Sequence, residues 1–274
     1  MSHAPMDKAV ILARGLGTRM RKEDGSAKLT DTQARMADAG VKAMIPIGRP
    51  FLDYVLSILA DAGYKRACLV IGPEHDAVRT YYARTVKPRR LTVEFAVQVK
   101  PLGTADAVAA AEPFAGADPF LVINSDNYYP PEALKALRGL AGAGLAAFER
   151  NAMLAGSNIP ADRITKFAVV QSGPSGRVVR IIEKPDQQTL DSLGEPVCLS
   201  MNCWRFGPKI FQACRSISPS ARGELELPDA VQYAIDRLGE TFQVLPFRLP
   251  VLDLSSRGDI AAVAQRLQGV EVDL

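Results

Sequence analysis

Histidine is scarce in this chain of 274 residues, which contains only His3 and His75. A catalytic triad of serine, histidine and aspartate would have to use His75, and a zinc site with several histidines is hard to build. The four cysteines (Cys68, Cys198, Cys203 and Cys214) form no CxxC pair, which favours buried free thiols over metal or redox chemistry. Chemistry in this chain therefore rests on carboxylates, lysines, arginines and recruited metal ions, a profile that suits phosphate chemistry.

Long apolar runs and a strong net charge are also absent. No apolar run approaches the roughly 20 residues that a membrane span requires, so we expect no association with a membrane. The start MSHAPMDK lacks the apolar core of a secretory signal, and we therefore expect a cytoplasmic protein. The net charge is only +3, with basic and acidic residues interspersed, which argues against a nucleic acid polymer as a partner.

Strand-like and helix-like segments alternate over about the first 150 residues. Short β-branched runs such as KAVILA and PFLVINSD are separated by helical patterns such as PFLDYVLSILADAGY. This rhythm predicts an α/β fold with a largely parallel sheet covered by helices on both faces. After about residue 160, ITKFAVVQSGPSGRVVRIIEKP predicts a β-hairpin. Because no linker or repeat is visible, we expect one domain over 1–274, with halves of about 1–150 and 151–274.

The stretch VILARGLGTRMR (10–21) places a glycine-containing loop directly after the first predicted strand. Open α/β sheets bind nucleotides at such strand ends. Gly15 and Gly17 would let backbone N–H groups approach a phosphate or a base, and Arg19 would offer forked donors to phosphate oxygens. The third glycine of the dinucleotide fingerprint and the P-loop pattern are both missing, which disfavours a nucleotide-binding oxidoreductase. Alone, the loop is equally compatible with a tight turn that carries solvated arginines.

The GTRM segment, together with VKAMIPIGRP (41–50), resembles the sugar-1-phosphate nucleotidyltransferases, in particular the glucose-1-phosphate thymidylyl- and uridylyltransferases. Six motifs follow the order of that family over 8–258. The resemblance implies a Rossmann-like (GT-A-type) fold with a mixed, mostly parallel central sheet and a small β-rich sugar-binding part. It implies an enzyme of the EC 2.7.7 type that condenses a nucleoside triphosphate with a sugar 1-phosphate, releasing pyrophosphate and using Mg²⁺.

On the nucleotide side, the resemblance assigns Arg19 and Lys42 to the phosphates of the triphosphate. In VQVKPLGTADA (97–107), Gln98 falls in the base-reading position, where an amide can offer a donor and an acceptor to one base edge. The full set that the resemblance assigns to nucleotide binding is Ala13, Gly15, Gly17, Thr18, Gln98, Gly103 and Thr104.

On the acceptor side, IIEKP (181–185) resembles the sugar motif of the family, with Glu183 on the sugar hydroxyls and Lys184 on the sugar phosphate. Lys184 thereby joins Arg19 and Lys42 as a catalytic cation. Ala168 and Asn202 occupy sugar-binding positions where the family usually has glycine, and they would narrow the space for the hydroxyls.

Two aspartates are implied as the Mg²⁺ ligands. Asp126 ends the strand motif FLVINSDNYY, and Asp229 lies in SPSARGELELPDAV (218–231), which resembles the thymidylyltransferases. The segment LDLSS around Asp253 resembles a late motif of the family, to which we assign a lesser, structural role. Since a phosphate monoester is ionised near neutral pH, the reaction requires no general base.

Several alternatives stay open. Arg19 and Lys42 are separated by 22 residues, a longer gap than the family leads us to expect, so Lys28 is a rival for the phosphate lysine. Arg14 stands where the family usually has glycine or alanine. Gln98 favours UTP or dTTP, with an ATP- or GTP-using member or a catalytically silent regulatory subunit as alternatives. We also expect a homo-oligomer.

Overall fold

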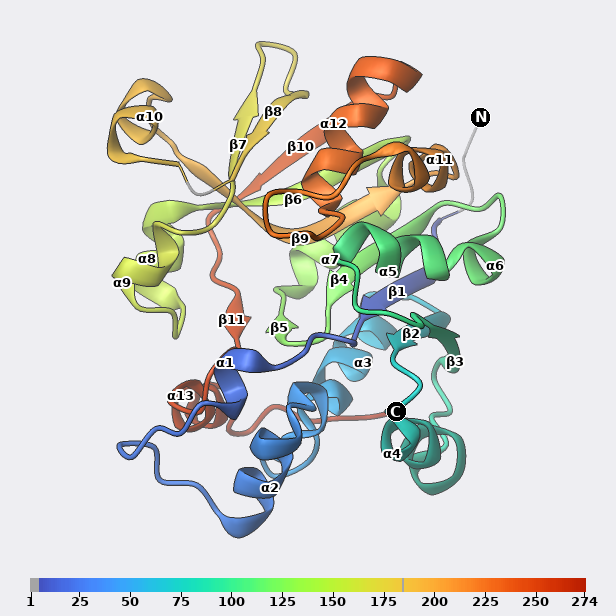
Figure 1. Cartoon of the computed structure of the whole chain (residues 1–274), viewed down its shortest axis with the longest axis vertical. Coiled ribbons are helices and arrows are strands. Elements are labelled where there is room, and N and C mark those ends of the chain that lie inside the picture. Colours follow the sequence, from blue (N-terminus) through green and yellow to red (C-terminus); the bar gives the residue numbers. More distant parts are fainter. Residues whose placement is uncertain (1–4, 184) are drawn as a thin grey trace.

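The structure, a computed structural model, describes residues 5–183 and 185–274, and a nine-stranded sheet lies at the centre of these residues (Figure 1). The main path has the order β10-β6-β9-β4-β1-β2-β3. Its strands are β1 (Lys8–Leu12), β2 (Arg66–Ile71), β3 (Thr92–Val97), β4 (Phe120–Asn124), β6 (Ala143–Glu149), β9 (Cys198–Phe206) and β10 (Phe242–Phe247). Only β9 runs antiparallel to its neighbours on this path. The predicted mixed, mostly parallel sheet is confirmed.

Both faces of the sheet are buried, as the apolar strand sequences predict. In β1, Ala9 and Ile11 belong to one buried cluster and Val10 belongs to a second, because successive side chains point to opposite faces. The first cluster is covered by α3 (Phe51–Asp61), α7 (Pro131–Gly139) and α13 (Asp259–Arg266). The second is covered by α5 (Thr104–Ala110), α11 (Lys209–Ser216) and α12 (Leu227–Leu238).

The remaining helices are short and lie mainly in the connections around the sheet (Figure 1). They are α1 (Thr18–Arg21), α2 (Asp31–Ala39), η1 (Lys42–Met44), α4 (Asp76–Thr80), η2 (Tyr81–Val86), α6 (Glu112–Ala115), α8 (Arg150–Gly156), α9 (Ala161–Ile164) and α10 (Gln187–Ser192).

The second half of the chain adds the β-hairpin that the sequence predicts. Strands β7 (Val169–Ser172) and β8 (Val178–Ile182) pair antiparallel, and β7 also pairs with β9 through Val169 and Leu199. Two further short strands, β5 (Asn127–Tyr128) and β11 (Leu252–Asp253), pair antiparallel with each other. This small pairing brings the late segment near residue 253 to the end of β4.

The long stretch between Arg19 and Lys42 contains an ordered helix, α2. Thr30 caps its N-terminus: Gln33 N donates to the Thr30 hydroxyl (3.3 Å), and Thr30 N donates to the Gln33 side chain (3.0 Å), which forms a capping box. Gly40 ends the helix at φ +74°, a left-handed conformation that glycine adopts without steric cost. The Gln33 amide also donates to the carbonyl of Pro46 (2.9 Å), so the helix is tied to the segment that follows it.

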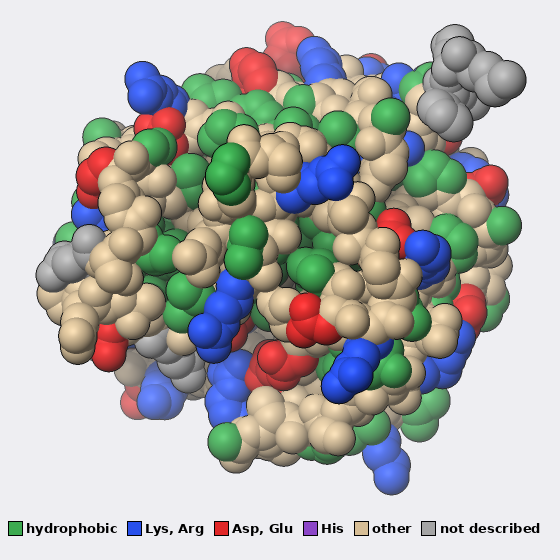
Figure 2. Space-filling view, turned by 90° about the horizontal axis from the view of Figure 1, so that it is seen from above, with side chains coloured by type: hydrophobic (Ala, Val, Ile, Leu, Met, Phe, Trp, Pro, Cys, Tyr) green, Lys and Arg blue, Asp and Glu red, His purple; other side chains and the backbone are tan. Residues whose placement is uncertain are grey.

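Charges of both signs are interspersed on the surface. Figure 2 views the molecule from the side of β7, β8 and α12, and on this face lysine and arginine side chains alternate with aspartate and glutamate. Over the part of the chain that the structure describes, no helix combines the length and apolar character needed to cross a bilayer.

Candidate nucleotide-binding site

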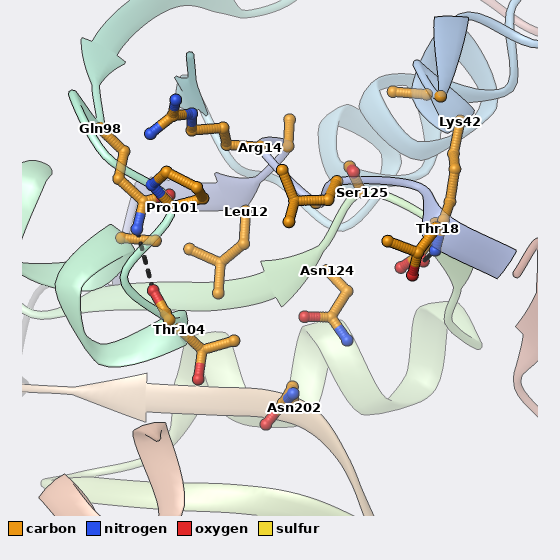
Figure 3. Close-up of a pocket in the computed structure, with 18 of the residues that line it drawn as sticks. Leu12, Arg14, Thr18, Lys42, Gln98, Pro101, Thr104, Asn124, Ser125 and Asn202 are labelled. Carbon is orange, nitrogen blue, oxygen red and sulfur yellow. Dashed lines mark hydrogen bonds and ion pairs between the residues drawn. The ribbon is translucent and has the colours of Figure 1, made fainter. Parts of the chain in front are cut away.

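A cavity of about 370 Å³, lined by both polar and apolar residues, opens at the carboxyl ends of β1, β3 and β4 (Figure 3). Its size lies within the range of small-ligand sites. The chain continues from β1 to β2 on one side of β1, whereas β4 flanks β1 on the other side. The cavity therefore lies at the point where an open α/β sheet changes direction, the usual position of a ligand site.

Most of the residues predicted to bind the nucleotide meet around this cavity. The predicted residues that line it are Ala13, Gly15, Thr18, Lys42, Gln98, Gly103, Thr104, Asp126 and Asn202. Of the other predicted residues that the structure describes, Gly17, Arg19, Ala168, Glu183 and Asp229 are not in the lining. Arg19 is exposed on α1. The prediction for Lys184 lies outside the described residues.

Gly17 and Gly40 fix the shape of the loop that follows β1. Gly17 adopts φ +62° as the residue before α1, and a Cβ atom there would lie 2.7 Å from the Cα atom of Gly40. That distance is shorter than real Cβ contacts allow, so the two glycine backbones pack directly against each other. Gly17 thus acts on the cavity through this close backbone approach, which also fixes the end of α2 beside the loop.

Lys42 and Asp126 form an ion pair in the cavity wall. The Lys42 Nζ atom lies 2.7 Å from Asp126 Oδ2, and the two side chains are only 16% and 20% exposed. Lys42 comes from η1, just after α2, and Asp126 follows the end of β4. Lys28, the rival candidate, is exposed and lies outside the cavity lining within the described chain. The geometry thus joins Lys42 to the strand-end aspartate.

Asp253 lies directly beside Asp126, because β11 pairs with β5. Leu254 N donates to the Asp126 carbonyl (2.8 Å), and the Asn127 amide donates to Asp253 Oδ1 (3.0 Å). Asp253 is also paired with Arg163, which holds Asp259 at 3.1 Å. Burial, followed by the charge of Asp126, raises the pKa of Asp253 to about 6. The late motif therefore contributes a second carboxylate to the end of β4.

Asp229, which the resemblance implies as the second metal ligand, lies on a different element and, like Asp253, is outside the cavity lining of the described residues. It lies in the first turn of α12, and partial burial and the charge of Glu226 raise its pKa. The segment before α12 is docked onto the start of α5, where Leu227 N donates to the Thr104 hydroxyl (2.9 Å). This docking fixes the start of α12 against α5, and among the described residues the cavity wall there includes Glu224 but not Asp229.

The predicted base-reading segment is braced by the same docking. Gly103 adopts φ +120°, Leu225 N donates to the Leu102 carbonyl (2.7 Å), and Ala105 N donates to the Leu225 carbonyl (2.9 Å). The Gln98 amide nitrogen donates to the Gly103 carbonyl (2.9 Å) and to Asp106 Oδ2 (2.8 Å). Both amide hydrogens of Gln98 are therefore used within the chain, and only its oxygen is left for a base.

Replacing Gly103 with alanine should displace this segment. A Cβ atom at Gly103 would lie 2.6 Å from Leu225 N, and φ +120° is a conformation that L-residues rarely adopt. We expect a loss of about 1–3 kcal/mol of folding free energy together with weaker nucleotide binding, measured by thermal unfolding and titration calorimetry. Gly116→Ala is the matched control, since Gly116 also has a positive φ (+61°) but open space around its Cβ position. It should lose stability alone, and equal nucleotide binding by the two variants would contradict the expectation.

On the acceptor side, the structure explains one departure from the family pattern. Asn202 lies on β9 and lines the cavity with φ +54°, a left-handed conformation that only glycine and asparagine adopt readily. Asparagine at this position therefore keeps the backbone conformation that glycine would allow. Ala168 is buried beside β9, where its carbonyl accepts from Ser200 N (2.8 Å), and Glu183 is exposed at the end of β8.

Several cavity residues were not predicted as site residues. Asn124 and Ser125 precede Asp126 at the end of β4, and Arg14 follows Ala13. Their sequence neighbours were already assigned, so proximity along a strand end was the available signal. Glu224 lines the cavity beside Leu225, which is hydrogen-bonded to Leu102 and Ala105, and Asp253 approaches Asp126 because β11 pairs with β5. These contacts join positions more than 100 residues apart, for which a single sequence carries no local signal.

A glycine-containing loop, a lysine–aspartate pair and an amide surround one cavity at the strand ends of a mostly parallel α/β sheet. This arrangement defines a Rossmann-like nucleotide-binding protein. Comparison with known sequences gives the particular family: the sequence model described as nucleotidyl transferase matches residues 8–246. The chain belongs to this family.

Individual relatives agree with this assignment. Glucose-1-phosphate thymidylyltransferase of Streptomyces griseus is 32% identical over 232 residues, which cover 84% of this chain and 57% of the relative. UTP–glucose-1-phosphate uridylyltransferase AglF of Haloferax volcanii is 27% identical over 263 residues, 95% of this chain and 96% of AglF. Against three of the curated relatives that it matches, the chain spans only 47–59% of their length.

The fold is also shared with a solved structure of UDP-glucose pyrophosphorylase complexed with UDP-glucose. The TM-score is 0.74 at 18% identity, over 97% of this chain and 100% of the other. The shared fold thus extends over nearly the whole chain.

Proposed function

We propose that this protein is a sugar-1-phosphate nucleotidyltransferase, which condenses a nucleoside triphosphate with a sugar 1-phosphate into a nucleoside-diphosphate sugar and pyrophosphate. The observation that carries this proposal is the Lys42–Asp126 pair in the same cavity as the glycine-containing loop and Gln98. Lys42 and Asp126, which suit phosphates and a metal ion, lie in one part of the cavity, and the Gln98 amide, which suits a base, lies in another. Binding of a nucleotide requires groups of both kinds.

The reaction joins two polyanions, so the site must offset their repulsion. A phosphate oxygen of the sugar 1-phosphate forms a bond to the α-phosphorus, and the bond from that phosphorus to the β-phosphate oxygen breaks, releasing pyrophosphate. Lys42 would bind the phosphates of the triphosphate, aided by backbone N–H groups near Gly15. From the sequence, Arg19 would assist it, and Lys184 and Glu183 would bind the sugar phosphate and hydroxyls. Catalysis by such groups consists of positioning and electrostatic stabilisation.

The residues at the end of β4 fit a magnesium ion. Among the described residues, no three histidine, cysteine or carboxylate side chains gather into a metal-binding group. Mg²⁺ requires less, since it usually takes one or two carboxylates together with phosphate oxygens of the substrate. Asp126 and Asp253 are two adjacent carboxylates whose repulsion a divalent cation would relieve. We propose these two as its ligands; when bound, the ion would neutralise charge on the reacting phosphates.

A pyrimidine triphosphate, UTP or dTTP, is the favoured substrate. The support is twofold: the position of Gln98 in the base-reading segment, and the thymidylyl- and uridylyltransferase names of the two relatives described above. The sugar is the less constrained partner, because Ala168 and Asn202 depart from the usual glycines there.

A substrate matrix tests this function directly. We expect pyrophosphate release with UTP or dTTP and at least one sugar 1-phosphate, dependent on Mg²⁺, when UTP, dTTP, CTP, ATP and GTP are each combined with a panel of sugar 1-phosphates. Preference for a purine triphosphate would overturn the pyrimidine assignment and leave the reaction class intact. Nucleotide binding without pyrophosphate release for every pair would instead identify a regulatory subunit.

A further inference from the structure

Arg14 is a cavity residue for which the reaction described above provides no role. It follows the end of β1, and in Figure 3 its side chain extends toward the side of the cavity that holds Gln98 and Pro101, away from Lys42. The side chain is only 8% exposed. A guanidinium group withdrawn from solvent to this extent normally has its donors occupied.

The donors of Arg14 are occupied only in part. Its Nε and Nη2 atoms each lie 3.4 Å from an oxygen of Glu74, longer than the 2.7–2.9 Å usual for such charge-assisted contacts. Nη1 is buried and has no hydrogen-bond partner within the described chain. Glu74 is half exposed, so it anchors one edge of the guanidinium group loosely. The remaining edge is a buried donor whose acceptor would arrive with a ligand.

Gln98 has no donor left to offer, whereas Arg14 has a donor without an acceptor within the described chain. Its two amide hydrogens are donated to Gly103 and Asp106, so its side chain can present only an acceptor oxygen to the cavity. One wall residue therefore offers a donor and another offers an acceptor on the same side of the cavity. A ring N–H next to a carbonyl group has the complementary pattern.

We propose that Arg14 is a specificity-determining residue that selects oxo bases. Its Nη1 atom donates to the carbonyl oxygen of the base, while the neighbouring ring N–H donates to the Gln98 oxygen. Uracil and thymine present this pair, and so does guanine; cytosine and adenine present an amino group beside a bare ring nitrogen. With cytosine, the amino group would face the guanidinium donor and the bare nitrogen would face the Gln98 oxygen, so neither would be paired.

This inference rests on the proposed function for the identity of the ligand, and nucleotide binding alone tests it. We expect wild-type protein to bind UTP or dTTP about 10- to 100-fold more tightly than CTP, in titration calorimetry without sugar phosphate. Arg14→Ala should weaken UTP binding and bring UTP and CTP to within about threefold of each other. Arg14→Lys, which keeps the charge but loses the forked donors, should also lose most of the discrimination. Glu74→Gln should reduce it less.

Arg79→Ala is the matched control, because Arg79 lies on α4 outside the cavity lining and pairs with Asp76. It should leave both affinities unchanged. An unchanged ratio of UTP to CTP affinity in folded Arg14→Ala, or an equal loss for UTP, CTP and ATP, would overturn the proposal, since a structural role would weaken all nucleotides alike. If Arg14→Ala does not fold, the ratio in Arg14→Lys decides. The outcome is separate from the proposed function, which fails only if no substrate pair releases pyrophosphate.

Discussion

Replacing Lys42 with alanine should weaken the binding of the nucleoside triphosphate about 30- to 100-fold, which corresponds to about 2–3 kcal/mol. The ammonium group of Lys42 is mostly shielded from water and stands 2.7 Å from Asp126, so solvent screens its attraction for phosphates only in part. Its loss also leaves Asp126 unpaired, and that carboxylate would then repel the incoming phosphates. Titration with the triphosphate in the absence of sugar phosphate measures the effect.

Lys28→Ala is the matched control for this change. Lys28 lies in the same inserted stretch and carries the same charge, but it is exposed and outside the cavity wall. The expected affinity of Lys28→Ala equals that of the wild type. A nucleotide defect in Lys28→Ala with normal binding in Lys42→Ala would mean that the correspondence with the family is misaligned across 20–41.

The parts of the fold that depend on local sequence could be predicted. β1, β4 and the β7–β8 hairpin coincide with β-branched runs and with a Gly/Pro/Ser turn, where the preference of each segment agrees with its place in the sheet. The site residues that directly follow such strands were predictable for the same reason. Lys42 is not one of them, because it follows α2. A polar residue at the carboxyl end of a buried strand has only one edge of the sheet to occupy.

Helix α2 was absent from the predicted elements although a local signal for it exists. Thr30 and Gln33 have the spacing of a capping box, and Gly40 closes the helix. The structure shows that the insertion ends in Gly40, packed on the loop at Gly17, and so leads directly to Lys42.

Other features of the site depend on contacts that the sequence does not encode locally. The approach of Asp253 to Asp126 results from a two-residue pairing between β11 and β5 across more than 120 positions. The hydrogen bonds of Gln98 to Gly103 and Asp106 depend on how the loop before α5 closes. The order of the motifs therefore placed Gln98 correctly in the cavity. The donor that was predicted to read the base, however, is already used within the chain.

The other large effect is a loss of turnover when either of the two proposed metal ligands is replaced. Asp126→Asn should lower turnover about 10³-fold, or about 4 kcal/mol, because the amide keeps the shape of the side chain but loses the charge that holds the ion. Asp253→Asn should give a similar loss, since Leu254 N donates to the Asp126 carbonyl and the charge of Asp126 acts on Asp253. Asp229→Asn should change turnover by less than about threefold, because the charge that acts on Asp229 is that of Glu226. Turnover at saturating Mg²⁺ measures all three.

Binding of Mn²⁺ to the nucleotide complex, followed by electron paramagnetic resonance, separates loss of the metal from loss of the fold. Asp253 is buried and bonded to Asn127, Ser255 and Arg163, so its replacement could act through packing alone. In that case the unfolding temperature would fall while Mn²⁺ affinity stayed normal. Weakened Mn²⁺ binding in Asp126→Asn and Asp253→Asn, at unfolding temperatures close to that of the wild type, is the expected pattern. Weakened binding in Asp229→Asn but not in Asp253→Asn would contradict the proposed pair and support the ligand pair that the motifs imply.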